Sequence, residues 1–311
     1  MNSRQSAKAT AVACLVVATL CWGSIPIFLR YFTNFLGPWT VNGIRYSTAA
    51  VFWLPFVLVL WPRSRREASS ASRSPWRDAL VPFLVNVFGQ VGYGVSPYFL
   101  PASTIGFALR VSFLFTVVLG FVFLAEERPL ARRPAFWLGA VASLAGVALL
   151  FAGRLRLGDG NFLVGMAILL AATLSWGAYG VSVRKFMAPY PARLSFGIIS
   201  IYTSSVLLVL MVALGRLGRL ADLSLGLWGM LIGSGLLGVA FGHVLYFRAL
   251  HRLGPIVCAG VMLATPFVTY LGAALFLGER LTVVQFAGGL LVVVGGAVLL
   301  MTRSRMEQVA G

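Results

Sequence analysis

The sequence predicts an all-α membrane protein of ten transmembrane helices, formed by two inverted five-helix repeats with both termini cytoplasmic. Three observations lead to this prediction: the composition, a set of motifs that occurs twice, and the distribution of positive charge among the loops. Hydrophobic residues make up 59% of the 311 residues and charged residues 11%. Because soluble domains carry about 25% charged residues, this composition indicates a chain whose main solvent is lipid.

Ten apolar segments follow one another, each bounded by arginine, proline, glycine or polar clusters. A helix needs roughly 20 apolar residues to cross a bilayer. The expected helices cover residues 10–29, 39–60, 79–98, 102–124, 134–152, 162–182, 194–214, 227–248, 255–277 and 284–301. The hydrophilic segment 63–78 is expected to be a loop, and no separate soluble domain is expected. A cleavable signal peptide is not expected, since the first apolar segment is too long for one.

The lysines and arginines orient these helices. If the N-terminus is cytoplasmic, 17 of the 25 basic residues fall in inner segments and six in outer loops. Positive charge is retained on the cytoplasmic side of membrane proteins. The formal net charge of +17 is therefore explained by topology, and binding to nucleic acid is not expected.

Several short motifs occur twice. TLCWGSIPIFLRYF at 19–32 is repeated as TLSWGAYGVSVRKF at 173–186, and FGQVGY at 88–93 is repeated as FGHVLY at 241–246. The repeats divide the chain at 1–153 and 154–311. Each half contains five expected helices, an odd number, so the second half must enter the membrane with the opposite orientation. Inverted repeats of this kind are typical of secondary transporters, which hold their solute near the membrane midplane between the two halves.

A GER-type element precedes the fifth and tenth expected helices, as Glu126-Glu127-Arg128-Pro129 and as Gly278-Glu279-Arg280. With ten spans and a Trp-Gly pair in spans one and six, the chain resembles the EamA-type members of the drug/metabolite transporter (DMT) superfamily. Within it, the chain is similar to bacterial exporters of the aromatic amino acid (YddG-like) branch. The resemblance implies a central cavity lined mainly by spans one, three, four, six, eight and nine, with spans five and ten as scaffold.

Polar residues of the repeated motifs are candidates for binding substrate. Asn86, Gln90 and Tyr93 are spaced i, i+4 and i+7, so they form one stripe along a helix. His243 and Tyr246 occupy the equivalent positions in the second half. Polar side chains are costly in contact with lipid, so this stripe should line the cavity. The alternative is that these groups form hydrogen bonds between helices.

Aromatic residues and prolines within the spans add further candidates. Trp22, Trp176 and Tyr179 lie inside their expected helices, where they would line the cavity or pack in the core. Pro26 and Pro266 also lie inside expected helices. Because proline removes a backbone donor and kinks a helix, both are candidates for a hinge or gate, or they simply shape the packing.

Arg45 and Arg110 lie several residues inside the second and fourth spans. An arginine there can extend toward the membrane surface or bind backbone carbonyls. The alternative is that it binds a substrate carboxylate, since the guanidinium group presents a planar fork to that group. Arg110 is the stronger candidate for substrate binding.

The acidic residues all lie in loops, at span ends or in the C-terminal tail: Glu67, Asp78, Glu126, Glu127, Asp159, Asp222, Glu279 and Glu307. His243 is then the one deep titratable candidate for proton coupling, because His251 is expected in a loop. We therefore expect a facilitator or exchanger for neutral, hydrophobic or aromatic amino acids. The alternative is an exporter of drugs or nucleoside-type metabolites that is coupled to protons through His243.

Enzyme and cofactor motifs are missing from the sequence. No Walker A, HExxH or GxSxG motif occurs in a suitable context, and Cys14, Cys21 and Cys258 lie in apolar segments without a CxxC pair. We expect no enzyme activity, no cofactor and no metal site. The expected partners are a small-molecule substrate and the lipid bilayer of the inner (plasma) membrane. Gly139, Gly146, Gly289 and Gly296 would serve internal packing or a weak homodimer; a monomer is the other expectation.

Overall fold

The computed structural model describes residues 3–67, 74–123, 128–129, 132–150 and 160–310. The first half contains α1 (Ser3–Phe32), α2 (Pro38–Glu67), α3 (Pro75–Asp78), α4 (Leu80–Val95), the 3-10 helix η1 (Ser96–Tyr98), α5 (Ala102–Ala108), α6 (Val111–Phe123) and α7 (Pro134–Leu150). The second half contains α8 (Gly160–Phe186), α9 (Ala192–Leu214), the 3-10 helix η3 (Leu217–Leu220), α10 (Leu225–Gly235), a π-helix (Leu236–Phe241), α11 (Gly242–Met262), α12 (Thr265–Leu277) and α13 (Val283–Ala310).

The described residues contain eight helical spans that are long and apolar enough to cross a membrane. In three of them consecutive helices form one span: α3, α4 and η1; α5 with α6; and α10, the π-helix and the beginning of α11. The apolar helices α7 and α12 are shorter. Large apolar side chains cover the outer surface: Val51, Phe88 and Leu275 are 72%, 71% and 70% exposed. Such a surface is suited to lipid and confirms the prediction of an all-helical membrane protein.

The prediction of a loop between residues 248 and 255 is wrong. Helix α11 continues from Gly242 to Met262, so His251 lies in a helix and not in a loop. The sequence suggested a break at Gly254-Pro255, but membrane helices tolerate glycine and proline where neighbouring groups satisfy the freed backbone. A break occurs further along, inside the expected helix 255–277, at Leu263–Ala264, just before Pro266 in the first turn of α12. A similar break at Leu109–Arg110 separates α5 from α6.

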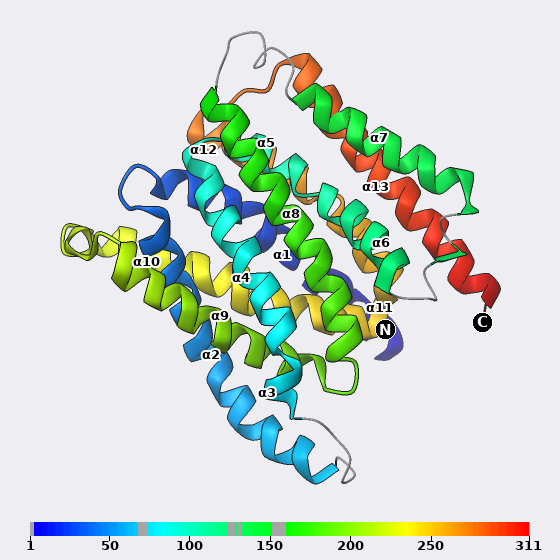
Figure 1. Ribbon diagram of the computed structural model, residues 1–311, viewed down its shortest axis with the longest axis horizontal. Coiled ribbons are helices and arrows are strands. Elements are labelled where there is room, and N and C mark those ends of the chain that lie inside the picture. The colour runs from blue at the N-terminus through cyan, green and yellow to red at the C-terminus, as the bar shows by residue number, and fades with distance from the viewer. Residues whose placement is uncertain (1–2, 68–73, 124–127, 130–131, 151–159, 311) are drawn as a thin grey trace.

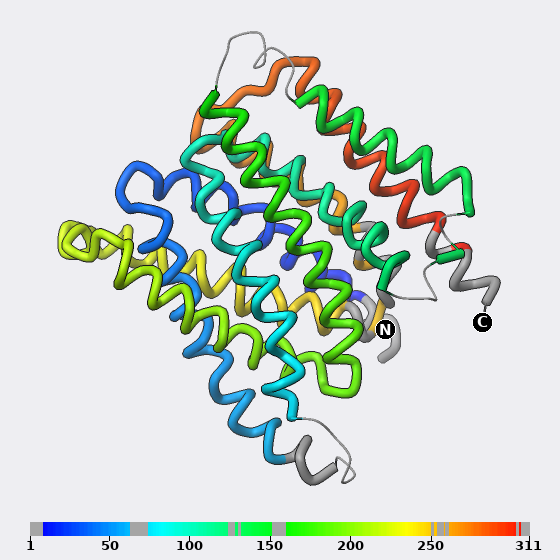
Figure 2. Tube along the Cα trace, in the orientation of Figure 1, coloured from blue at the N-terminus to red at the C-terminus, as the bar shows by residue number. Residues whose placement is uncertain are grey.

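The long helices lie side by side in a bundle (Figure 1). Helix α1 packs against α11 and α12, α2 against α9, α4 against α8, and α7 against α13. The Cα trace shows α13, from the second half of the sequence, running beside α7 from the first half (Figure 2). Segments from the two halves of the sequence therefore alternate in space and do not form two separate bodies.

Glycines hold α7 and α13 together. A Cβ on Gly139 would lie 2.8 Å from the carbonyl oxygen of Gly295, and one on Gly146 would lie 2.5 Å from that of Gly288. As the residue number rises along α7, the contacted number falls along α13, so the two helices are antiparallel. Small residues allow this close approach where lipid provides no hydrophobic drive between helices.

On α13, the glycines that meet α7 lie one position before the two that the sequence suggested. Gly289 faces the ring of Phe107, and Gly296 lies near Leu263. Gly139 and Gly146 of α7 thus pack against α13 of the same chain.

Two Trp–Gly contacts link the halves reciprocally. A Cβ on Gly89 of α4 would lie 2.6 Å from Nε1 of Trp176 on α8, and a Cβ on Gly242 of α11 would lie 2.6 Å from Nε1 of Trp22 on α1. These are the Trp of one repeated motif and the Gly of the other, and each tryptophan meets the glycine of the opposite half. The Trp-Gly motif of each half therefore contacts the Phe-Gly motif of the other half.

The glycine of each Trp-Gly pair has a matching role. A Cβ on Gly23 would lie 2.7 Å from the Val268 side chain on α12, and one on Gly177 would lie 2.7 Å from the Phe115 side chain on α6. In each Trp-Gly pair the glycine allows a second helix to approach closely. Helix α1 thus packs on α12 as α8 packs on α6.

Glu279 connects the two halves at one end of the bundle. Its carboxylate accepts hydrogen bonds from the backbone N–H groups of Ala102 (2.8 Å) and Ser103 (2.9 Å) and from the Ser103 hydroxyl (2.8 Å). Arg30 lies 4.0 Å from the same carboxylate. The first N–H groups of a helix have no partner inside it, so Glu279 caps α5 from the loop that follows α12.

Substitution of Glu279 by alanine should lower stability markedly. The change leaves the two backbone N–H groups of α5 without this acceptor, and hydrogen bonds to a charged group contribute about 1.5–3 kcal/mol. We expect a clear fall in the melting temperature of the purified protein in detergent. Asp222→Asn, at an exposed loop position, is the control and should leave the melting temperature unchanged; equal effects would refute the capping role.

Alanine at Gly89 or at Gly242 should destabilise the fold to a similar degree. Each new methyl group meets a tryptophan ring that cannot move without disturbing the core, and overpacking typically costs about 1–3 kcal/mol. Thermal unfolding in detergent measures the effect. Gly233→Ala on α10 is the matched control, because nothing lies within 4 Å of its Cβ position. Reciprocal contacts would be unimportant if all three variants melted like the parent protein.

Candidate functional site

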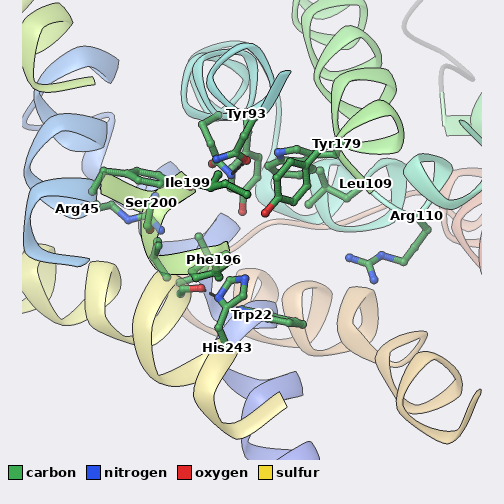
Figure 3. Close-up of a pocket in the computed structure, with 17 residues that line it drawn as sticks. Trp22, Arg45, Tyr93, Leu109, Arg110, Tyr179, Phe196, Ile199, Ser200 and His243 are labelled. Carbon is green, nitrogen blue, oxygen red and sulfur yellow. Dashed lines mark hydrogen bonds between the residues drawn. The ribbon is translucent and has the colours of Figure 1, made fainter. Parts of the chain in front are cut away.

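The bundle encloses a cavity of about 260 Å³. Its walls come from α1, α2, α4, the break between α5 and α6, α8, α9, the π-helix and α11 (Figure 3). Both halves of the sequence contribute. The lining residues are Trp22, Ile25, Arg45, Tyr46, Asn86, Gln90, Tyr93, Leu109, Arg110, Trp176, Tyr179, Phe196, Ile199, Ser200, Gly238, Val239 and His243.

The polar stripe predicted on α4 lies along this cavity. Asn86 donates a hydrogen bond from Nδ2 to Oγ1 of Thr203 on α9 (3.0 Å), and Gln90 donates from Nε2 to Oδ1 of Asn86 (3.4 Å). The ring centroid of Tyr93 lies 5.1 Å from that of Trp176. The stripe therefore does both things that the sequence left open: it forms hydrogen bonds between helices and presents polar groups to the cavity.

His243 is held between aromatic rings on the opposite side of the cavity. It stacks on Phe196 with ring centroids 4.0 Å apart and meets Trp22 edge-on at 4.9 Å. Its Nδ1 atom is buried and has no hydrogen-bond partner among the described residues. Figure 3 shows the imidazole and the indole side by side at the cavity edge. The two aromatic contacts hold the imidazole on the cavity wall.

The π-helix explains the orientation of two tryptophans. Its Gly238 carbonyl accepts a hydrogen bond from Nε1 of Trp22 (3.0 Å), and its Val239 carbonyl accepts one from Nε1 of the buried Trp53 (3.0 Å). A π-helical turn is wider than an α-helical one and often occurs at functional sites. Here it directs consecutive carbonyls at α1 and α2 and fixes Trp22 on the cavity wall.

Two guanidinium groups enter the cavity from opposite sides (Figure 3). Arg45 on α2 is only 2% exposed and donates from Nε to Oγ of Ser234 (3.1 Å). Arg110, at the break between α5 and α6, donates from Nη1 to the carbonyl of Met262 (3.3 Å). Met262 immediately precedes the matching break between α11 and α12. Arg110 thus joins the two interrupted spans.

Tyr246 does not line this cavity. Its ring lies 5.1 Å from that of Trp22, and it borders an adjacent cavity of about 220 Å³ together with Arg110, Met262 and Gly296. Neither predicted hinge residue borders the main cavity: Pro26 is buried within the continuous α1, and Pro266 lies in the first turn of α12.

The sequence interpretation missed part of the lining. Tyr46 on α2 and Phe196, Ile199 and Ser200 on α9 border the cavity, whereas no residue of α12 does. Spans two and seven, which correspond to α2 and α9, therefore line the cavity, although they were not expected to. Span nine was expected to line it, but no residue of α12 is found in the described lining. Ser200 offered a signal, as a hydroxyl inside an apolar segment, and its Oγ is buried without a partner among the described residues.

The chain is similar to known proteins in sequence and in fold. The model of the EamA-like transporter family matches this chain twice, at residues 9–152 and 163–301. The chain belongs to the EamA-like transporter family. This establishes a transport protein of the drug/metabolite transporter superfamily, as the Trp-Gly motifs predicted, and a multi-pass protein of the inner membrane.

Individual relatives are distant. A protein of Salmonella typhimurium called a probable amino-acid metabolite efflux pump is 25% identical over 308 residues, which cover 93% of this chain and 94% of the relative. A protein of Escherichia coli K12 with the same name is 27% identical over 225 residues, 67% of this chain and 69% of the relative. An uncharacterized transporter of Archaeoglobus fulgidus is 20% identical over 90% of this chain and 95% of its own length.

A solved crystal structure whose title names no function shares the fold. It superimposes with a TM-score of 0.62 at 18% sequence identity, over 97% of this chain and 99% of the other. At this identity the likeness concerns the fold alone. The assignment to the EamA-like transporter family therefore rests on the two segments that match the family model.

Water access to the cavity can be tested at Ser200. In a variant without the three native cysteines, Ser200→Cys should react with a small methanethiosulfonate reagent at least ten times faster than Ser143→Cys. Both serines are 2% exposed. Ser200 lines the cavity, whereas Ser143 lies against Gly295 in the α7–α13 interface, so its thiol should be shielded by protein. Mass spectrometry follows the reaction, and equal rates would contradict an accessible cavity at Ser200.

Proposed function

We propose that this chain is a secondary transporter that exports amino acids or closely related metabolites with apolar or aromatic side chains, by alternating access around the central cavity. The main support is the cavity, whose wall is formed by the repeated motifs of both halves. Across the two halves, the ring of Trp22 contacts that of His243, and the ring of Tyr93 contacts that of Trp176. A site placed between two equivalent halves can open to either side when the halves rock.

The proposed topology is ten transmembrane helices in two inverted repeats, 1–153 and 154–311, with both termini cytoplasmic. The antiparallel contact of α7 with α13 and the reciprocal Trp–Gly pairs support it. The beginning of α1 and the end of α13 lie at one end of the bundle (Figure 1). The excess of lysine and arginine in the segments assigned to that side supports a cytoplasmic orientation.

The proposed hinges are the breaks within spans four and nine. Leu109–Arg110 and Leu263–Ala264 interrupt these spans at comparable positions, and Pro266 follows the second break. Pro26 is the proposed counterpart in α1. Helix bends in membrane proteins are permitted where the freed backbone groups meet protein or water, and the Arg110 contact with the Met262 carbonyl provides this.

The proposed substrate class rests on size and chemistry. A volume of about 260 Å³ lies just below the usual range of ligand pockets, about 300–1,000 Å³, so it suits a small metabolite better than a bulky drug. Aromatic rings provide apolar contact, and Asn86, Gln90 and Ser200 provide hydrogen bonds. The two relatives that are called probable amino-acid metabolite efflux pumps agree with this class. An exporter of drugs or nucleoside-type metabolites is the second candidate.

Counterflow in proteoliposomes tests the proposal. Vesicles loaded with unlabelled phenylalanine, leucine, methionine or lysine, or with one of their N-acylated or deaminated forms, should take up the labelled form of an apolar solute. Lysine should exchange at least ten times more slowly, because its ammonium group enters an apolar, aromatic cavity without a carboxylate. Exchange of nucleosides alone, with folded protein, would favour the second candidate.

We further propose facilitated diffusion or exchange in place of strong proton coupling. No Asp or Glu is found among the residues that line the cavity, and membrane carriers driven by protons usually keep an intramembrane group that titrates. Exchange should therefore be unchanged by a pH gradient across the vesicle membrane. Concentrative uptake driven by a pH gradient and abolished by His243→Gln would contradict this proposal and assign proton coupling to His243.

A further inference from the structure

The cavity carries two positive groups and no negative one. Arg45 and Arg110 both line it, and no Asp or Glu does. The acids that the structure describes in side-chain detail lie elsewhere: Asp78 accepts a hydrogen bond from Tyr190 (2.8 Å), Glu279 caps α5, and Asp222 is exposed in a loop. Burying a charge is costly unless a group of opposite sign or strong hydrogen bonds compensate it.

Neither arginine is fully satisfied by the described protein groups. Arg45 uses Nε for Ser234, while its Nη2 lies beside the π-helix, 3.2 Å from the Cβ position of Gly238. Arg110 makes one long hydrogen bond, to the Met262 carbonyl, and its buried Nε has no partner within the described part of the chain. The guanidinium group has five N–H donors, so both groups retain donors for an anionic ligand.

A zwitterionic solute would meet this cavity unfavourably. Its carboxylate could bind a guanidinium group, but its ammonium group would enter a space with two positive charges and no counter-charge. Aromatic faces attract an ammonium group by about 0.5–2 kcal/mol, which does not neutralise the two guanidinium charges, and one face of His243 is already stacked on Phe196. The amides of Asn86 and Gln90 suit an acyl or keto oxygen better.

We propose that the preferred solute is a small organic anion: a monocarboxylate with an apolar or aromatic body whose α-amino group is acylated or absent. The inference rests on the proposed transport function and narrows its substrate class. The carboxylate binds Arg45 or Arg110 through the planar fork of the guanidinium group. The body lies between Trp22 and Trp176, and the amides of α4 bind the acyl or keto oxygen.

A charge series with a constant aromatic body tests the inference. The probes are N-acetyl-L-phenylalanine (anion), L-phenylalanine (zwitterion), N-acetyl-L-phenylalanine amide (neutral) and phenethylamine (cation), titrated by calorimetry into purified full-length protein. The Kd of the anion should be at least ten-fold lower than that of the zwitterion, and the cation should bind most weakly. Equal or tighter binding of the zwitterion, together with exchange in vesicles, would overturn the charge preference while the transport proposal stands.

Variants assign the preference to the two arginines. At least one of Arg45→Gln and Arg110→Gln should raise the Kd of the anion ten-fold or more, and both should leave that of the neutral amide within about two-fold. Arg110→Lys should recover part of the loss, and Arg216→Gln, at an exposed loop position, should have no effect. An unchanged anion-to-amide ratio in folded variants would overturn the role of both arginines. The wild-type series remains decisive where a variant fails to fold.

Net transport provides an independent readout. An anion carries charge, so its distribution across the membrane should follow an imposed potassium diffusion potential, by about fifty-fold per 100 mV at equilibrium. Transport of a zwitterion has no such dependence. Uptake of labelled N-acetyl-L-phenylalanine that ignored the potential would overturn net anion transport. If none of the four probes bound folded protein and none exchanged, the proposed function itself would be refuted.

Discussion

The fold depends on the reciprocal contact of tryptophan with glycine between the halves of the chain. Trp22 lies against Gly242, and Trp176 lies against Gly89. The glycines let the helices approach until the indole rings fill the space between them, and the same rings then border the cavity. In lipid, where helix association relies on close packing, this one contact serves both stability and the shape of the site.

The two halves match in packing and differ at the site. The first half offers a regular helix with the amides of Asn86 and Gln90, while the second offers a π-helix, His243 and aromatic rings. The π-helical carbonyls of Gly238 and Val239 bind indole N–H groups. One wall therefore provides polar groups and the other provides apolar faces, which suits a solute with a polar head and an apolar body.

The sequence was most informative where a physical pattern repeats. Composition predicted the helices, and the repeated motifs predicted two equivalent halves. The sequence did not show that Trp22 meets Gly242 and that Trp176 meets Gly89, because a motif alone does not reveal its partner across the bundle. The position of the break in α11 and α12 was not predictable, since Gly254-Pro255 carries the stronger local signal and tertiary packing decides otherwise. The sequence also did not predict that Tyr46, Phe196 and Ser200 line the cavity. Helices without a repeated polar stripe do not indicate which of their faces meets the cavity. The π-helix has no sequence signature at all.

The central claim is that solute binds between Trp22 and Trp176, with its anionic group on Arg45 or Arg110. A crystal or cryo-electron microscopy structure of the protein with N-acetyl-L-phenylalanine tests it most directly. The account predicts density for the ring between the two indoles and for the carboxylate at a guanidinium group. Solute density confined to the adjacent cavity at Tyr246, or to the outside of the bundle, would contradict it.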